Sequence, residues 1–227
     1  MPFPDLADRV AEVRGRIAAA VARGGHGQEV TLVAVTKTYG PEAVHAAWES
    51  GVRDVGENKV QEALLKMDDV SVPVRWHLIG HLQRNKAKSV DRFALVHSVD
   101  SGRLADAVAR LGNDRGRPVD ALMQVNVVGE ETKGGLSPVE AGVEGERWLA
   151  LRGLRVVGVM TMAPLDADER TLRSTFGVAR AVRDRLLALG HPAIALSMGM
   201  SNDYEIAVEE GATMVRLGTV LFGARHA

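Results

Sequence analysis

The sequence contains no cysteine, few aromatic residues and almost no net charge. Without cysteine the chain has no disulfide, no thiolate metal site and no thiol nucleophile. Such a composition fits a reducing compartment, so we expect a cytoplasmic protein. Lys and Arg number 28 against 29 for Asp and Glu, a formal net charge of −1, so no charge excess favours nucleic acid as a partner.

The sequence also lacks a long apolar run. Asp5, Asp8 and Glu12 interrupt the first 25 residues, which therefore do not resemble a signal peptide, and no later run reaches membrane-spanning length. We expect no membrane partner. Apolar residues still make up 46% of the 227 residues, enough for a substantial core in one α/β barrel or in two smaller domains.

Hydrophobic periodicity separates helices from strands along the chain. Apolar residues at steps of three and four predict an amphipathic helix over residues 4–23 that ends at Gly24 and Gly25. Short apolar runs rich in β-branched residues predict buried parallel strands at 30–35, 52–55, 74–79, 93–97, 119–127, 154–160, 193–197 and 213–217. Helical spacing recurs between most of these strands, and Ser137 to Glu140 forms a capping box.

This alternation predicts the fold class α/β, as a single (β/α)₈ TIM-type barrel with an extra N-terminal helix. We expect one domain over residues 1–227, with residues 1–25 packed outside the barrel, because no linker or low-complexity tract interrupts the series. The alternative is a doubly wound open sheet.

Lys37 is the most informative of the polar residues that follow the predicted strands. Barrels of this type place their chemistry at the carboxyl ends of the strands, and Lys37 follows the apolar run 30–35 directly. Burial would lower its pKa and favour an amine that attacks a carbonyl to form a Schiff base. A structural ion pair is an equally good interpretation of the pattern alone.

A phosphate site is predicted in the loops after the last two strands. Ser201 follows the seventh strand, and Gly218 and Thr219 follow the eighth, which are the loops where barrels commonly bind phosphate. Each segment alone would also serve as an ordinary helix cap or turn.

Three other groups of polar residues are candidate sites. Arg216 stands inside an apolar strand and needs a fixed acceptor, although a structural salt bridge would satisfy it equally well. His77 and His81 straddle a strand end without a carboxylate at metal-ligand spacing, so we expect no metal. The basic cluster of Arg84, Lys86 and Lys88 is more typical of a solvated helix face than of a nucleic-acid site.

Taken together, these residues resemble the pyridoxal 5′-phosphate (PLP) homeostasis proteins of the YggS/PROSC type over nearly the whole chain. The resemblance rests on Ala34-Val-Thr-Lys37, Gly56-Glu-Asn-Lys-Val-Gln-Glu62, Trp76-His-Leu-Ile-Gly-His-Leu-Gln-Arg-Asn-Lys86, Val125-Asn126, Lys133-Gly-Gly-Leu136, Met160-Thr-Met-Ala-Pro164, Leu196-Ser-Met-Gly-Met-Ser201, Val215-Arg-Leu-Gly-Thr219 and Phe222-Gly223. The family is similar in turn to the barrel domain of alanine racemases and of eukaryotic-type ornithine decarboxylases. The chain departs from the family pattern at Lys59 and His81.

The resemblance implies a role for each matching residue. Lys37 would carry PLP as a Schiff base, and Arg216 would face the pyridine nitrogen. The remaining cofactor-binding residues it implies are Ser201, Gly218 and Thr219 at the phosphate, Asn58 beside the ring, and His77 and Met198 in the pocket lining.

The resemblance further implies a PLP carrier or buffer rather than an enzyme. An arginine opposite the pyridine nitrogen would keep that nitrogen unprotonated and weaken the ring as an electron sink. The chain ends soon after the last strand, so we expect no second domain, no opposite-face base and a monomer. PLP-dependent apo-enzymes would be the recipients. The alternatives are a weak single-domain PLP-dependent racemase and a cofactor-free Schiff-base aldolase that uses Lys37.

Overall fold

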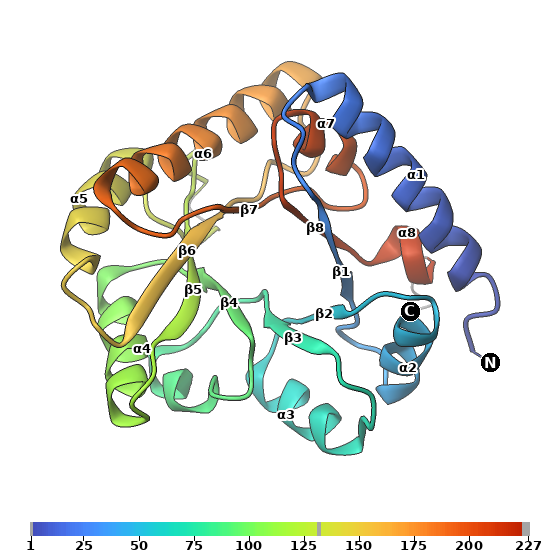
Figure 1. Ribbon diagram of the computed structural model, residues 1–227, viewed down its shortest axis with the longest axis horizontal. Helices are drawn as coiled ribbons and strands as arrows, with labels where there is room; N and C mark the ends of the chain where they lie inside the picture. Colours follow the sequence, from blue (N-terminus) through green and yellow to red (C-terminus); the bar gives the residue numbers. More distant parts are fainter. Residues whose placement is uncertain (1, 131–132, 224–227) are drawn as a thin grey trace.

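Eight parallel strands close into a barrel in the order in which they occur along the chain (Figure 1). The computed structural model describes residues 2–130 and 133–223. The strands are β1 (Thr31–Val35), β2 (Asp54–Glu57), β3 (Arg75–Leu78), β4 (Leu95–Val99), β5 (Val119–Gln124), β6 (Leu154–Met160), β7 (Ala195–Ser197) and β8 (Met214–Leu217). Pairing of β1 with β8 closes the ring, so the TIM-type barrel is confirmed and the open-sheet alternative is wrong.

Helices follow the strands and surround the barrel (Figure 1). They are α1 (Leu6–Gly24), α2 (Pro41–Glu49), α3 (Val60–Asp69), α4 (Gly102–Asp114), α5 (Pro138–Trp148), α6 (Glu169–Leu189), α7 (Tyr204–Glu209) and α8 (Thr219–Phe222), with a 3₁₀ segment η1 (Arg84–Ser89) after β3. The helices after β7 and β8 have only six and four residues. Both therefore lack the length that gives a helix a strong dipole.

The barrel has two separate apolar layers. The larger lies between the outer faces of the strands and the helices, and it includes Val55, Leu78 and Phe176. A smaller cluster of buried side chains from successive strands fills part of the barrel interior: Leu95, Leu122, Met160 and Ala195. Because most residues on both faces of the strands are buried, strands such as β1 and β6 have the largely apolar sequences from which they were predicted.

Helix α1 packs outside the barrel against α7, α8 and α2 (Figure 1). It ends at Gly25 in the left-handed conformation, with φ 69°, so the predicted glycine stop is confirmed. Its last residue must be small, since a Cβ on Gly24 would lie 2.4 Å from the carbonyl oxygen of Glu209 on α7. Ion pairs from Arg16 to Glu205 and from Arg23 to Glu209 support the same contact.

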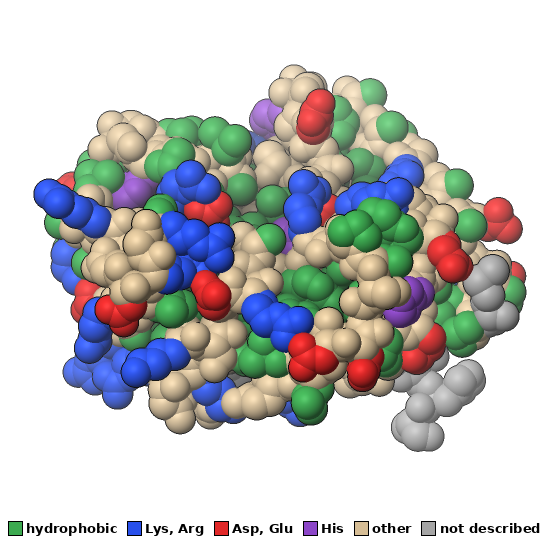
Figure 2. Space-filling model, turned by 60° about the horizontal axis from the view of Figure 1, so that its bottom comes forward, with side chains coloured by type: hydrophobic (Ala, Val, Ile, Leu, Met, Phe, Trp, Pro, Cys, Tyr) green, Lys and Arg blue, Asp and Glu red, His purple; other side chains and the backbone are tan. Residues whose placement is uncertain are grey.

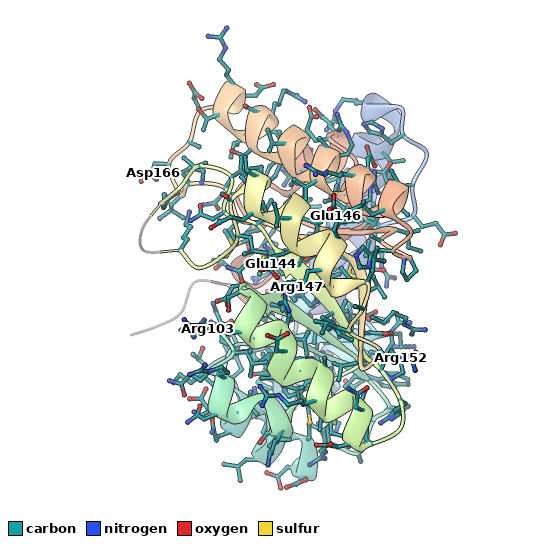
Figure 3. The ribbon with its side chains drawn as sticks, turned by 90° about the vertical axis from the view of Figure 1, so that its left-hand side faces the viewer. Arg103, Glu144, Glu146, Arg147, Arg152 and Asp166 are labelled. Atoms are coloured by element: carbon teal, nitrogen blue, oxygen red, sulfur yellow. The ribbon has the colours of Figure 1, made fainter. Side chains whose placement is uncertain are left out.

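On the opposite flank, α4, α5 and α6 lie side by side (Figure 3). The predicted capping box at the start of α5 is confirmed, with Ser137 and Glu140 each accepting a hydrogen bond from the other's backbone N–H. Figure 3 shows Glu144 and Arg147 at the boundary of α5 with α4. Arg147 donates there to the Asp106 carboxylate over 2.8 Å, which joins the two helices.

Basic and acidic side chains are interspersed over the face shown in Figure 2. Among the described residues, no helix is both long and apolar enough to span a membrane.

Candidate functional site

A cavity of about 460 Å³, here called the C-terminal cavity, opens where the strands end. Residues from the loops after β1, β2, β3, β5, β6, β7 and β8 contribute to its wall. Six residues singled out from the sequence lie in the lining: Lys37, Asn58, Ser201, Arg216, Gly218 and Thr219. The barrel thus brings together residues that are up to 182 positions apart, from Lys37 to Thr219.

Lys37 is half-buried in a tight turn that follows β1. The turn is closed by a hydrogen bond of 3.1 Å from the Tyr39 N–H to the Thr36 carbonyl. Thr38 has φ 72° and is the single non-glycine residue with positive φ in the described part of the chain. Because a β-branched residue is strained there, the surrounding structure must hold this turn in place.

Ser201, Gly218 and Thr219 form one corner of the C-terminal cavity. The Ser201 hydroxyl oxygen accepts a hydrogen bond of 3.3 Å from the Val220 N–H, which joins the loop after β7 to α8. Since α7 and α8 are so short, hydroxyl and backbone N–H groups, rather than a helix dipole, would have to bind an anion at this corner.

Arg216 forms part of the cavity floor and is 4% exposed. Its guanidinium donates a hydrogen bond of 2.6 Å to the Ser197 hydroxyl and one of 2.9 Å to the Thr161 carbonyl oxygen. Burial lowers the pKa of Arg216 to about 10, and Asp203 acts in the opposite direction. The group therefore stays protonated at neutral pH, and the hydrogen bonds that hold it go to neutral oxygens.

His77 and Met198 are outside the cavity lining. His77 lies in the barrel interior, where its ring contacts the Asp54 carboxylate at 2.8 Å and the His97 ring at 2.9 Å. Met198 is fully buried in the main core. The expectation that these two side chains line the pocket is therefore not met, because neighbouring side chains cover both of them.

Sequence reasoning assigned no cofactor role to several residues of the lining: Gln124, His81, Lys133 and Asp203. Lys133 donates to Glu130 and to the Ala163 carbonyl, at 2.8 and 3.0 Å. Asp203 accepts from the Met200 N–H at 2.6 Å, and burial raises its pKa. The available signals for Lys133 were its position beside two glycines after β5 and its place in the family motif Lys133-Gly-Gly-Leu136. His81, where the family pattern differs, is exposed and contacts Asp100.

The lining of the C-terminal cavity does not include Arg84, Lys86 or Lys88. Across residues 2–130 and 133–223, the structure contains no cluster of three or more potential metal ligands. Arg84 and Lys88 are exposed on η1, and Lys86 is half-buried and donates to Gln61 at 2.9 Å. Lys59 pairs with Glu62 at the surface.

Comparison with known proteins identifies the family. A sequence model described as alanine racemase, N-terminal domain, matches residues 11–226. The pyridoxal phosphate homeostasis protein of Aquifex aeolicus is 40% identical over 226 residues, which cover 96% of this chain and 97% of the relative. The protein of the same description from Escherichia coli K12 is 38% identical, with 97% of each chain covered. The chain belongs to the pyridoxal phosphate homeostasis protein family.

Solved structures agree with this assignment. The structure of PipY from Synechococcus elongatus, described as having PLP bound, is 34% identical with a TM-score of 0.86, covering 96% of this chain and 100% of that one. An alanine racemase of Clostridium difficile is 14% identical with a TM-score of 0.73 and covers 94% of this chain and 58% of its own. At that identity the likeness shows the barrel fold alone.

Proposed function

We propose that this protein holds PLP as a Schiff base on Lys37 and acts in PLP homeostasis as a carrier or buffer that supplies apo-enzymes. The observation that carries the proposal is the convergence of a lysine, a buried arginine and a corner bearing two hydroxyls on one cavity. The PLP-bound description of the S. elongatus relative supports the choice of cofactor. Schiff-base formation joins the Lys37 nitrogen to the aldehyde carbon with loss of water, and hydrolysis returns both unchanged.

The donor set of the C-terminal cavity fits PLP. Its volume of about 460 Å³ lies in the range of small-molecule sites. The hydroxyls of Ser201 and Thr219 suit a phosphate, and Met162 and Met200 supply apolar surface for an aromatic ring. Lys37 would form the covalent bond, with Asn58 beside it.

Arg216 favours a carrier over a strong catalyst. When bound, PLP supplies an electron sink whose strength depends on a proton at the ring nitrogen. Arg216 keeps its own proton at neutral pH and, opposite that nitrogen, would not provide one. The site would then hold the aldehyde reversibly without strongly activating a bound amino acid.

The test of Lys37 is borohydride reduction of the PLP-loaded protein followed by peptide mass spectrometry. We expect the pyridoxyl group on Lys37, and no reducible adduct at this site after Lys37→Ala. Lys133→Ala is the matched control, because Lys133 lines the same cavity. A label spread evenly over surface lysines, or the absence of any adduct, would overturn the proposal.

Carrier and enzyme are separated by two further measurements. We expect transfer of PLP from the loaded protein to an apo-enzyme, and α-proton exchange in added amino acids far slower than ~1 s⁻¹. Exchange at or above that rate would favour the racemase. Aldol cleavage by the cofactor-free protein would favour the aldolase. We further propose a monomer, which solution scattering would test. The lack of cysteine supports a cytoplasmic location.

A further inference from the structure

A chain of buried polar side chains, here called the barrel relay, runs through the barrel interior from its amino-terminal end to Arg216. The Arg216 guanidinium is 2.6 Å from the Ser197 hydroxyl, which is 3.0 Å from Nδ1 of His97. Nε2 of His97 is 2.9 Å from Nδ1 of His77, and Nε2 of His77 is 2.8 Å from the Asp54 carboxylate. Every member is at most 4% exposed.

The barrel relay crosses the barrel rather than following its wall. His97 is on β4 and Ser197 is on β7, two strands that are not neighbours in the sheet. A hydrogen bond between them therefore passes through the interior. At the far end, Asp54 begins β2 and lines a second cavity, the N-terminal cavity of about 570 Å³, on the opposite face from Lys37. Arg75, also in that lining, pairs with Asp54 at 2.6 Å.

The hydrogen bonds of the barrel relay have a single direction. Arg216 only donates, so its partner Ser197 accepts and can use its own hydrogen toward His97. The Asp54 carboxylate only accepts, so His77 carries its hydrogen on Nε2 and accepts at Nδ1. His97 then donates from Nε2 and accepts at Nδ1. With both rings neutral, each contact along the barrel relay pairs one hydrogen with one acceptor.

The electrostatics agree with a neutral His97 ring. Burial, with further contributions from His77 and Arg216, holds the pKa of His97 well below its usual range. Burial alone would raise the pKa of Asp54, but hydrogen bonds from His77 and Arg75 outweigh it and keep the carboxylate ionised. The barrel relay therefore spans two charged ends, Arg216 and the pair of Asp54 with Arg75.

A barrel interior needs no such chain for stability, because apolar side chains of similar volume fill it at least as well. The smaller apolar cluster shows that the same space also holds Leu95, Leu122 and Met160. What the polar chain adds is orientation. Ser197 and the Thr161 carbonyl fix two nitrogens of the guanidinium, and His97 fixes the hydroxyl that Ser197 presents.

We infer that Ser197 and His97 are positioning residues that aim the Arg216 guanidinium at the cofactor. Together with His77 and Asp54, they set the electrostatic environment of the pyridine ring of PLP. This inference rests on the proposed function, in which Arg216 faces the pyridine nitrogen. Charge near that nitrogen tunes the electronic state of PLP, so the absorption spectrum of the loaded protein reports the position of Arg216.

The experiment compares absorption spectra and PLP dissociation constants of the wild type, Ser197→Ala, Ser197→Thr and His97→Phe. We expect Ser197→Ala to shift the visible absorption maximum and to weaken PLP binding roughly tenfold, as for loss of a hydrogen bond to a charged group. Ser197→Thr keeps the hydroxyl and should restore both. His97→Phe should resemble Ser197→Ala, because the hydroxyl loses its acceptor. His191→Gln, at a buried histidine outside the barrel relay, should leave the spectrum unchanged.

A double-mutant cycle separates positioning from general damage. In an Arg216→Gln background, Ser197→Ala should cause no further spectral shift, since it acts only through the guanidinium. Equal shifts with and without Arg216 would overturn the inference, as would an unchanged spectrum in both Ser197→Ala and His97→Phe while the wild type binds PLP on Lys37. If the wild type forms no PLP adduct, the proposed function itself fails.

Discussion

Nζ of Lys66 on α3 lies 2.6 Å from Oε1 of Glu57 at the end of β2, and both side chains are buried. Lys66 also donates to the Thr36 carbonyl at 2.9 Å, and the Thr36 hydroxyl donates to Glu57 at 2.6 Å. Thr36 precedes Lys37, and Glu57 precedes Asn58. One buried ion pair thus sets the spacing of the two strand ends that carry these cavity residues.

Lys66→Met should destabilise the protein by about 3–5 kcal/mol, because it leaves the Glu57 carboxylate buried without a countercharge. Adding Glu57→Gln should recover part of the loss. Urea unfolding measures both. Lys59→Met is the matched control, since Lys59 pairs with Glu62 at the surface and should change little. If Lys66→Met alone were as stable as the double variant of Lys66→Met with Glu57→Gln, this account would be contradicted.

His97 should make the protein less stable as the pH falls below about 6.5, the usual value for histidine. Burial lowers its pKa in the folded state, so in this range the unfolded chain binds a proton that the folded chain does not. The free energy of unfolding should then decrease by up to about 1.4 kcal/mol per pH unit. His97→Phe should reduce this slope in urea unfolding between pH 7 and pH 5. If the free energy of unfolding changed with pH equally in the wild type and in His97→Phe, His97 would not be the source of the pH dependence.

Ser137→Ala should lower the free energy of unfolding by about 1 kcal/mol, because it removes the hydroxyl that caps α5. The comparison is Ser101→Ala at the start of α4, where the side chain makes no capping hydrogen bond. In thermal unfolding, the melting temperature of Ser137→Ala should be clearly lower than that of Ser101→Ala. Equal losses would mean that the capping box does not stabilise α5.

Phe3→Ala should weaken PLP binding as well as stability. The Phe3 ring packs edge-on against Tyr39 and Phe222, with centroid distances of 5.5 and 5.2 Å. Tyr39 belongs to the turn of Lys37, and Phe222 is the last residue of α8, which begins at Thr219. Each aromatic pair contributes about 0.5–1.5 kcal/mol beyond its buried area. Phe3→Leu keeps apolar volume, so it should lose less PLP affinity in a titration and less free energy of unfolding than Phe3→Ala. An unchanged PLP dissociation constant in folded Phe3→Ala would contradict this link.

Much of the C-terminal cavity could be predicted because parallel strands of a closed barrel end at the same rim. Once Lys37, Ser201, Arg216 and Thr219 were placed at or near strand ends, their convergence followed from topology. His77 was misplaced for a related reason: it is on β3 itself, and its side chain points into the barrel interior instead of reaching the cavity. Lys133 and Asp203 were assigned no cofactor role because loop conformation decides which loop residues turn toward a cavity.

The sequence by itself determined the strands to within a few residues at their ends, most of the helices, the glycine stop at Gly25 and the capping box at Ser137. Periodicity and capping depend on neighbours within a few positions, whereas the exact strand ends depend on pairing in the closed sheet. Only the tertiary structure decided that His97 meets Ser197, 100 residues away. Such a contact depends on barrel closure, which brings β4 and β7 face to face across the interior and leaves their polar side chains to satisfy each other away from water.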